Sequence, residues 1–140
     1  MKISTKGRYA LRLMVDLALN GKDRAIPLKE IASRQNISVK YLEQIINILN
    51  RSGYVKSTRG SLGGYRIAGL PSDYTVGMIL RLTEGNIAPV SCLEDEINIC
   101  PNKKDCTTLY VWEKLYESIK NTIDTITIED IAVNYKSQNI

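Results

Sequence analysis

Apolar residues near the start of the chain recur every three or four positions, which is the repeat of an amphipathic helix. This pattern predicts a helix over about residues 4–19, ended by Asn20-Gly21. The apolar face of this helix consists of Ala10, Leu13, Met14, Leu17 and Ala18. The chain therefore begins with an element that can bury one side in a core.

Two further helical segments follow, separated by a short polar turn at Asn36-Ile37. Pro27 suits the first position of a short helix that runs to Gln35. Ser38 is a natural N-cap for a third helix, which we expect to end at Gly53. The apolar stripe of the third helix consists of Val39, Leu42, Ile45, Ile46 and Leu49. Two helices joined by a tight turn predict a helix-turn-helix motif.

A β-hairpin is expected directly after the third helix. Residues 54–59 alternate as a strand does, the glycine-rich segment 60–64 can turn, and residues 65–68 return as a second strand. The glycine cluster lacks the order of a nucleotide phosphate loop and opens no helix, so we reject that reading. A helix-turn-helix followed by a hairpin predicts a winged helix.

The polar face of the third helix suits the major groove of DNA. Gln44 can pair with adenine, Glu43 can accept a hydrogen bond from cytosine, and lysine or arginine can reach guanine or phosphate. The residues of this face are Lys40, Tyr41, Glu43, Gln44, Asn47 and Arg51. Arg59 and Arg66 flank the turn of the hairpin, where an arginine can enter the minor groove.

The second half of the chain predicts three more helices. Thr75 can cap a helix that ends at Gly85, and Thr127 can cap a short last helix before a loose tail at 136–140. Between them, a helix over about 108–126 has apolar residues with heptad spacing, at Leu109, Trp112, Tyr116, Ile119, Ile123 and Ile126. We expect this seam to form a homodimer; the alternative is that it is buried in the core of its own chain.

Charge is divided unequally between the two halves of the chain. Residues 1–66 contain 13 Lys and Arg against 4 Asp and Glu, a net charge of +9. Residues 67–140 contain 6 against 11, a net charge of −5. A basic half joined to an acidic half is typical of a nucleic-acid-binding domain with a sensing or oligomerising part, although a basic solvated surface would give the same count.

All three cysteines lie in one polar segment with the spacing C-x7-C-x5-C, at Cys92, Cys100 and Cys106. Thiolates are soft ligands, so this segment suits zinc or an iron–sulfur cluster better than an apolar core. The sequence has no secretory signal and no apolar run near the roughly 20 residues that span a bilayer, so we expect a cytoplasmic protein without membrane contact. It contains no histidine and no nucleotide fingerprint, which argues against an enzyme.

Four segments carry a resemblance to a known family. They are the opening Met-Lys-Ile-Ser-Thr-Lys-Gly-Arg-Tyr-Ala10, the helix Ser38-Val-Lys-Tyr-Leu-Glu-Gln44, the hairpin Arg59-Gly-Ser-Leu-Gly-Gly-Tyr65 and the cysteine segment. Through them the chain resembles the Rrf family of winged-helix transcription regulators, the group of IscR, NsrR and CymR, over nearly all of its length. It is most similar to the three-cysteine IscR-like members.

The resemblance implies a homodimeric bacterial regulator, usually a repressor, that binds double-stranded DNA at a palindromic operator. It implies an iron–sulfur cluster, 2Fe-2S or 4Fe-4S, on Cys92, Cys100 and Cys106, which senses iron–sulfur status, oxygen or nitric oxide. It implies DNA contacts at or near Ser38, Lys40, Tyr41, Glu43, Gln44, Ser57, Arg59 and Gly60.

Two departures from the family leave the fourth cluster ligand open. Leu109 stands where IscR-like members have a histidine, and Arg8 stands where NsrR-like members can use an aspartate. Water, a small thiol, a partner-chain group or a local carboxylate could serve instead. The local carboxylates are Glu94, Asp95, Glu96 and Asp105.

Three parts are expected along the chain: a winged-helix domain over 1–85, a cysteine loop over 86–107, and a dimerisation and C-terminal helix over 108–140. The fold class is mainly α with a small β-hairpin wing. Two other functions remain open on the same scaffold. One is a zinc- or thiol-based regulator, and the other is a regulator of cysteine and sulfur metabolism controlled by a partner protein, as the resemblance to CymR implies.

Overall fold

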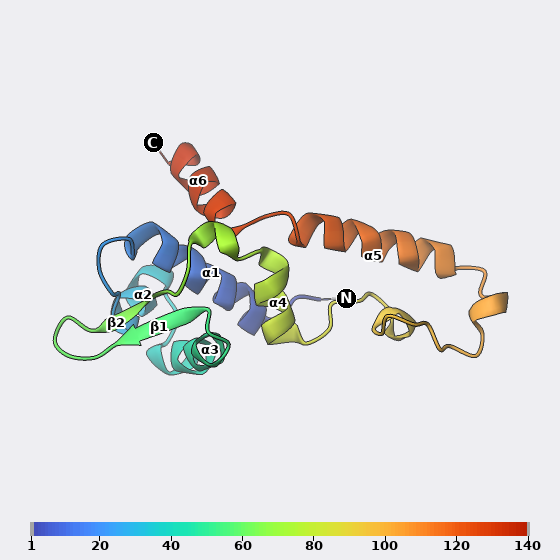
Figure 1. Cartoon of the computed structure of the whole chain (residues 1–140), viewed down its shortest axis with the longest axis horizontal. Helices are drawn as coiled ribbons and strands as arrows, with labels where there is room; N and C mark the ends of the chain where they lie inside the picture. The colour runs from blue at the N-terminus through green and yellow to red at the C-terminus, as the bar shows by residue number, and fades with distance from the viewer. Residues whose placement is uncertain (1, 140) are drawn as a thin grey trace.

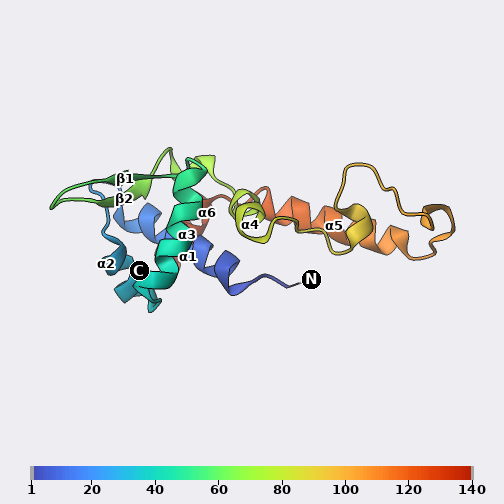
Figure 2. The same ribbon diagram turned by 90° about the horizontal axis from the view of Figure 1, so that it is seen from below.

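A computed structural model of the protein describes residues 2–139, and its two parts are a winged-helix body and a projecting arm (Figures 1 and 2). The body contains α1 (Thr5–Asn20), α2 (Leu28–Gln35), α3 (Val39–Arg51), β1 (Val55–Thr58), β2 (Gly64–Ile67), α4 (Val76–Glu84) and α6 (Ile128–Gln138). The arm consists of the loop over 86–108 and α5 (Leu109–Ile123). Within residues 2–139, no helix has the length and apolar character needed to cross a membrane.

Helix α1 forms the centre of the body. Ser4 caps it, because the amide of Gly7 donates to Ser4 Oγ at 3.1 Å. Its apolar face is fully buried at Leu13 and Met14, and α3, α4 and α6 all contact the helix. The helical repeat read from the sequence is therefore confirmed, since one stripe of α1 fills the core of the body.

The helix-turn-helix is formed by α2 and α3. Pro27 occupies the N-cap of α2 rather than its first helical position, so the helix begins at Leu28. Asn36 adopts the left-handed conformation, with φ of 53°, and reverses the chain between the two helices. Ser38 caps α3 as expected, because the amide of Tyr41 donates to Ser38 Oγ at 3.1 Å.

The wing is an antiparallel hairpin held against the body by a third short segment. Its register pairs Val55 with Ile67 and Thr58 with Gly64. Ile26 and Tyr65 exchange two backbone hydrogen bonds, each of 2.8 Å, so the segment before α2 joins the hairpin. A Cβ atom on Gly64 would overlap the backbone of Ile26, so only glycine allows this close approach.

The C-terminal part of the chain returns to the body at one joint. The amide of Val76 donates to the carbonyl of Ile126, and the amide of Ile128 donates to the carbonyl of Tyr74, both at 2.9 Å. Ile128 is fully buried, so α6 contributes directly to the winged-helix core. Thr127 caps α6 as expected, because the amide of Asp130 donates to Thr127 Oγ1 at 3.0 Å.

A bidentate ion pair strengthens this joint. Arg81 on α4 donates to both carboxylate oxygens of Asp124, at 2.6 and 2.9 Å. These hydrogen bonds hold the pKa of Asp124 below its usual value. The carboxylate lies against Gly77, where a Cβ atom would overlap it. The end of α5 is therefore fixed to α4 by charge as well as by backbone contacts.

Two expectations for the C-terminal half were wrong in detail. Helix α5 ends at Ile123, so Ile126 lies in the connection to α6 and not on the seam. Residues 136–138 continue α6 instead of forming a loose tail, and Ile140 lies outside the described residues. The first error arises because Ile126 is held by the backbone of Val76, a contact that no local pattern reveals. Residues 136–138 are exposed, so packing against the body does not explain the longer α6.

The close approach of Gly64 to Ile26 predicts a position-dependent effect of alanine. We expect Gly64→Ala to lower the free energy of unfolding by about 2 kcal/mol or more, because strain and overlap act together. Gly60→Ala is the matched control: φ is +100° there but no atom lies near, so we expect about 1 kcal/mol from strain alone. Urea denaturation measures both, and equal losses would contradict a role for the Ile26 contact.

Candidate nucleic-acid interface and cysteine loop

The exposed face of α3 presents most of the side chains expected to contact DNA. Ser38, Lys40, Glu43, Gln44 and Arg51 are all exposed. The opposite face of the helix is buried in the core at Leu42, Ile45, Ile46 and Leu49. Because the buried stripe fixes how α3 is rotated, its polar face points away from the body, as a recognition helix requires.

Tyr41 has a second role that the sequence did not indicate. Its ring packs edge-on against Tyr9 of α1, with ring centroids 5.6 Å apart. The guanidinium of Arg12 lies over the other ring of this pair, 5.2 Å from the centroid of Tyr9. Tyr41 is half-buried as a result, so it joins α3 to α1 as well as bordering the exposed face.

The wing carries the other expected DNA contacts. Ser57, Arg59 and Gly60 are exposed on β1 and the turn that follows it. Arg66 lies on β2 directly opposite Lys56, so the two cations are cross-strand neighbours. In Figure 2 the tip of the hairpin extends beyond the rest of the body, on the side away from the arm.

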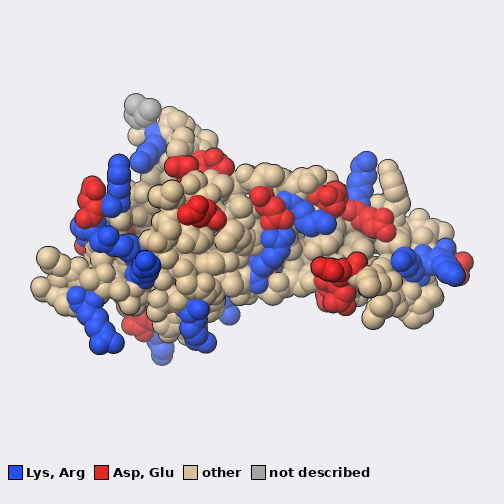
Figure 3. Space-filling view, in the orientation of Figure 1, with Lys and Arg blue, Asp and Glu red and all other residues tan. Residues whose placement is uncertain are grey.

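The surface charge follows the division seen in the sequence. Lys and Arg side chains surround the winged-helix end in Figure 3, including the wing. Along the arm, Asp and Glu side chains lie together with Lys and Arg side chains. The electrostatic potential that attracts a polyanion is therefore concentrated where the recognition helix and the wing are exposed.

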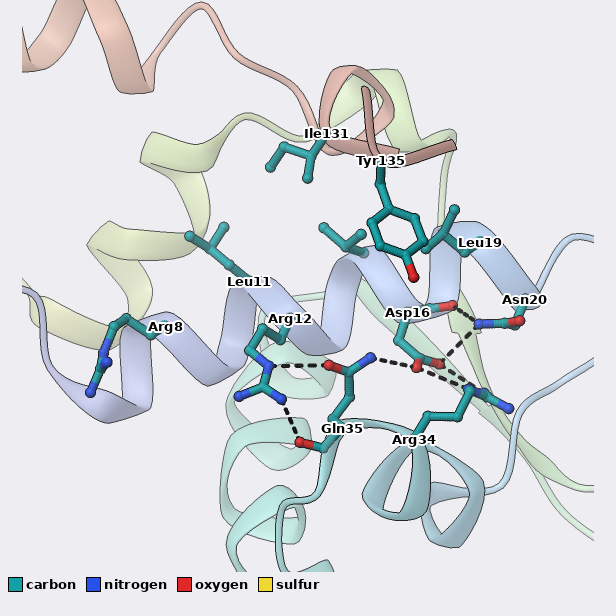
Figure 4. A pocket seen from close by; sticks show the side chains of 11 residues that line it. Arg8, Leu11, Arg12, Asp16, Leu19, Asn20, Arg34, Gln35, Ile131 and Tyr135 are labelled. Carbon is teal, nitrogen blue, oxygen red and sulfur yellow. Dashed lines mark hydrogen bonds and ion pairs between the residues drawn. The ribbon is translucent and has the colours of Figure 1, made fainter. Parts of the chain in front are cut away.

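A buried carboxylate ties α1 to the helix-turn-helix (Figure 4). Asp16 is only 1% exposed and accepts hydrogen bonds from Arg34 Nη2 at 2.8 Å, Arg34 Nε at 3.0 Å and Gln35 Nε2 at 2.9 Å. Arg12 in turn donates to the side chain and to the backbone carbonyl of Gln35. Sequence reasoning missed this network, although an aspartate between Leu13, Met14 and Leu17 on an apolar helix face was a signal for it.

This network forms one wall of a cavity of about 960 Å³ between α1, α2 and α6. The opposite wall is apolar and includes Leu19, Ile131 and Tyr135 (Figure 4). Since α6 borders this cavity and α2 begins the helix-turn-helix, Asp16 lies between the C-terminal helix and the recognition unit. Its chemical role is structural, because each of its oxygens already has donors.

The cysteines lie on a loop made mainly of turns, with two short 3-10 segments at Ser91–Leu93 and Lys103–Asp105. Cys92 and Cys100 are half-buried, and Cys106 is exposed. Across residues 2–139, no three His, Cys, Asp or Glu side chains are grouped closely enough to hold a metal ion. The prediction that the thiols share a metal therefore rests on their chemistry as donors.

Cys106 differs from the other two cysteines in its electrostatic setting. Hydrogen bonds from the backbone and side chain of Thr108, and from the amide of Leu109 at the start of α5, lower the pKa of its thiol. The thiolate is the form that binds metal. The carboxylates considered as a fourth ligand, Glu94, Asp95, Glu96 and Asp105, are all exposed on the same loop.

The sequence matches the Rrf2 family, described as an iron-dependent transcriptional regulator, over residues 3–134. The chain belongs to this family. The transcriptional regulator CymR of Bacillus subtilis is 42% identical over 132 residues, which cover 94% of this chain and 90% of CymR. The Rrf2 chain is therefore a DNA-binding transcription regulator and not an enzyme, as its sequence predicts.

Solved structures of Rrf2 regulators have the same fold. The structure of CymR, titled the global cysteine regulator of B. subtilis, superposes with a TM-score of 0.80 at 41% identity, covering 96% of this chain and 98% of CymR. The structure of T. potens IscR also gives 0.80, at 37% identity, covering 100% of this chain and 92% of IscR. The mainly α fold with a two-stranded wing is thus confirmed, and these two structures, one of CymR and one of IscR, superpose equally well.

The exposed wing and recognition helix predict two different losses of DNA affinity. We expect Arg59→Ala to weaken binding by about 1 kcal/mol or more on every sequence, and to reduce the salt slope by about one, because a cation is lost. Gln44→Ala should weaken binding only to the preferred duplex, at an unchanged slope. Titrations at several salt concentrations test this, with duplexes that the wild-type protein selects from random sequence; unchanged affinity in Arg59→Ala would contradict the placement of the wing.

The buried network predicts a strong dependence on the charge of Asp16. We expect Asp16→Asn to lower the free energy of unfolding by about 2 to 3 kcal/mol, because Arg34 loses its buried partner. Glu30→Gln is the control, since Glu30 bonds the same arginine from the surface and should cause a much smaller loss. Equal losses in urea denaturation would show that the buried network adds nothing.

Proposed function

We propose that two copies of this chain form a cytoplasmic repressor that binds a palindromic operator, with an iron–sulfur cluster on Cys92, Cys100 and Cys106 setting its affinity. The observation that carries the proposal is the position of the cysteines. In a member of the Rrf2 family, all three lie on one loop that leads directly into α5, at the end of the molecule away from the wing (Figure 1).

The proposed dimer is supported by the exposed apolar surface of the arm. None of the 15 residues of α5, all of which the structure describes, is buried. The expected seam at Trp112, Tyr116 and Ile119 is half-buried, and Tyr110 and Val111 on another face are 71% and 50% exposed. A helix with apolar residues on so much of its exposed surface is stabilised by a second copy. Twofold symmetry then gives two recognition helices for two half-sites.

The residues that would hold the cluster are Cys92, Cys100 and Cys106, whose three thiolates are the donor set that iron–sulfur clusters take. When bound, a cluster supplies iron that reacts with oxygen or nitric oxide and that is lost when iron is scarce. The chain itself keeps Cys106 disposed to ionise, through its hydrogen bonds to Thr108 and Leu109. Leu109 and Arg8 offer no fourth ligand, so that position is open to a carboxylate of the loop, to water or a small thiol, or to a group of the partner chain.

A second candidate is a regulator controlled by a partner protein, with zinc or free thiols on the cysteine loop. The 42% identity to CymR of B. subtilis favours it, because that relative is at least as similar as IscR. Under this alternative the cysteines would be incidental to the signal or would hold a structural metal.

Anaerobic purification separates the two candidates. We expect a coloured protein with matched iron and sulfide and no stoichiometric zinc. A colourless protein that takes up neither iron nor sulfide on reconstitution would overturn the cluster, and stoichiometric zinc or a captured partner would then support the second candidate.

Loss of one cysteine should separate cluster binding from assembly. We expect Cys100→Ala to abolish the visible absorption and the bound sulfide, because two thiolates hold a cluster too weakly. The molecular mass in light scattering should remain that of a dimer, since Cys100 lies outside α5. Ser91→Ala is a matched loop control that should keep full iron and sulfide; a Cys100→Ala protein with wild-type iron and sulfide would contradict ligation by that residue.

A further inference from the structure

The tip of the wing ends in an apolar side chain without a partner in the fold. Leu62 is 89% exposed, more than any other large apolar residue between positions 2 and 139. A leucine in water contributes nothing to the hydrophobic stabilisation of its own chain. Its position on the turn of the hairpin leaves this side chain free to contact a binding partner of the wing.

The backbone alone forms the turn that presents Leu62. The amide of Gly63 donates to the carbonyl of Gly60 at 2.9 Å, and Gly60 adopts φ of +100°, which favours glycine. A Cβ atom on Gly63 would overlap the carbonyl oxygens of Thr58 and Gly60. Because these glycines close the turn, the side chain of Leu62 is not needed to fold the wing.

The charge around Leu62 identifies the class of its partner. Lys56, Arg59 and Arg66 lie on the same hairpin, and all three are exposed. No Asp or Glu occurs anywhere from Gln44 to Ser72. The charged side chains of the hairpin itself are thus all cationic, and cations beside one apolar tip fit a polyanion that offers an apolar crevice. The minor groove of DNA offers this combination, because its walls are deoxyribose C–H groups between two rows of phosphates.

We propose that Leu62 enters the minor groove next to the site read by α3, packs against the deoxyribose edges and partly opens one base step. This inference rests on the proposed binding of a palindromic operator by the dimer and adds a specificity residue to it. A wedge of this kind favours steps that unstack easily, such as TA and CA/TG, over stiff A-tracts. Leu62 thus contributes to sequence specificity through the flexibility of one base step, without a hydrogen bond to a base.

The test compares the wild-type protein with Leu62→Ala and Leu70→Ala on a duplex that the wild-type protein selects from random sequence. Leu70 is the matched control, since it is also a leucine, 65% exposed, and lies after β2 beside α6 instead of on the turn. We expect Leu62→Ala to weaken binding about fivefold or more at an unchanged salt slope, because apolar contact is lost and charge is not. Leu70→Ala should bind as the wild-type protein does.

A second comparison tests the base step. The steps flanking each half-site are exchanged in turn from TA or CA to a stiff A-tract. Wild-type affinity should fall about threefold or more at one symmetric pair of positions, and Leu62→Ala should not respond there.

Three results would overturn the inference. They are Leu62→Ala binding within twofold of wild type, a reduced salt slope like that of Arg59→Ala, or equal responses of wild type and Leu62→Ala to every step. Failure of the proposed palindromic binding is recognised separately, because the duplexes that the wild-type protein selects would then lack two inverted half-sites. A circular dichroism spectrum and melting temperature equal to those of the wild-type protein ensure that the effect of Leu62→Ala is not unfolding.

Discussion

The buried carboxylate of Asp16 is the constraint on which the arrangement of the body depends. A charge at 1% exposure is stable only with full hydrogen bonding, and Arg34 and Gln35 supply it from the last turn of α2. The next residue, Asn36, starts the turn into α3. The hydrogen bonds of Asp16 therefore fix the orientation of the recognition helix relative to α1. Apolar contacts at Leu13 and Leu42 have no preferred direction, so they alone would let the helices shift against each other. A shift that breaks the bidentate ion pair of Asp16 would leave a buried charge unpaired.

Features fixed by local interactions were predictable from the sequence. The N-caps Ser38, Thr75 and Thr127 depend only on neighbouring residues, and the structure has all three. The stripe of α3 is buried as expected at Leu42, Ile45, Ile46 and Leu49, but Val39 in its first turn is exposed. Features that depend on distant contacts were not predictable. The glycine-rich turn was expected, but the reason for Gly64 is the backbone of Ile26, and the end of α5 is decided by the contact of Ile126 with Val76.

In the candidate site, too, locally determined features were predictable from the sequence and those set by distant contacts were not. Exposure of Lys40, Glu43, Gln44 and Arg59 follows from the helical and strand repeats, so the sequence could place them on the surface. The packing of Tyr41 on Tyr9 is a tertiary contact between two helices and carries no local signal. The cysteine loop has too few apolar residues to fix its own shape, and Ile97 and Ile99 are 72% and 81% exposed there. Spacing alone therefore could not place the three thiols relative to one another.

The packing of α6 against the body determines how chimeras of such regulators can be engineered. Ile128 belongs to the core cluster that α1 forms, and Ala132 of the same helix is also buried, although more than 40 residues separate them from α4 in the sequence. The DNA-binding unit is thus completed by the last helix of the chain, and the cysteine loop with α5 is inserted within it. A chimera that exchanges sensors should therefore replace the inserted segment between α4 and α6 and retain both ends of the chain; a fusion at the end of α4 would leave the DNA-binding unit with an open core.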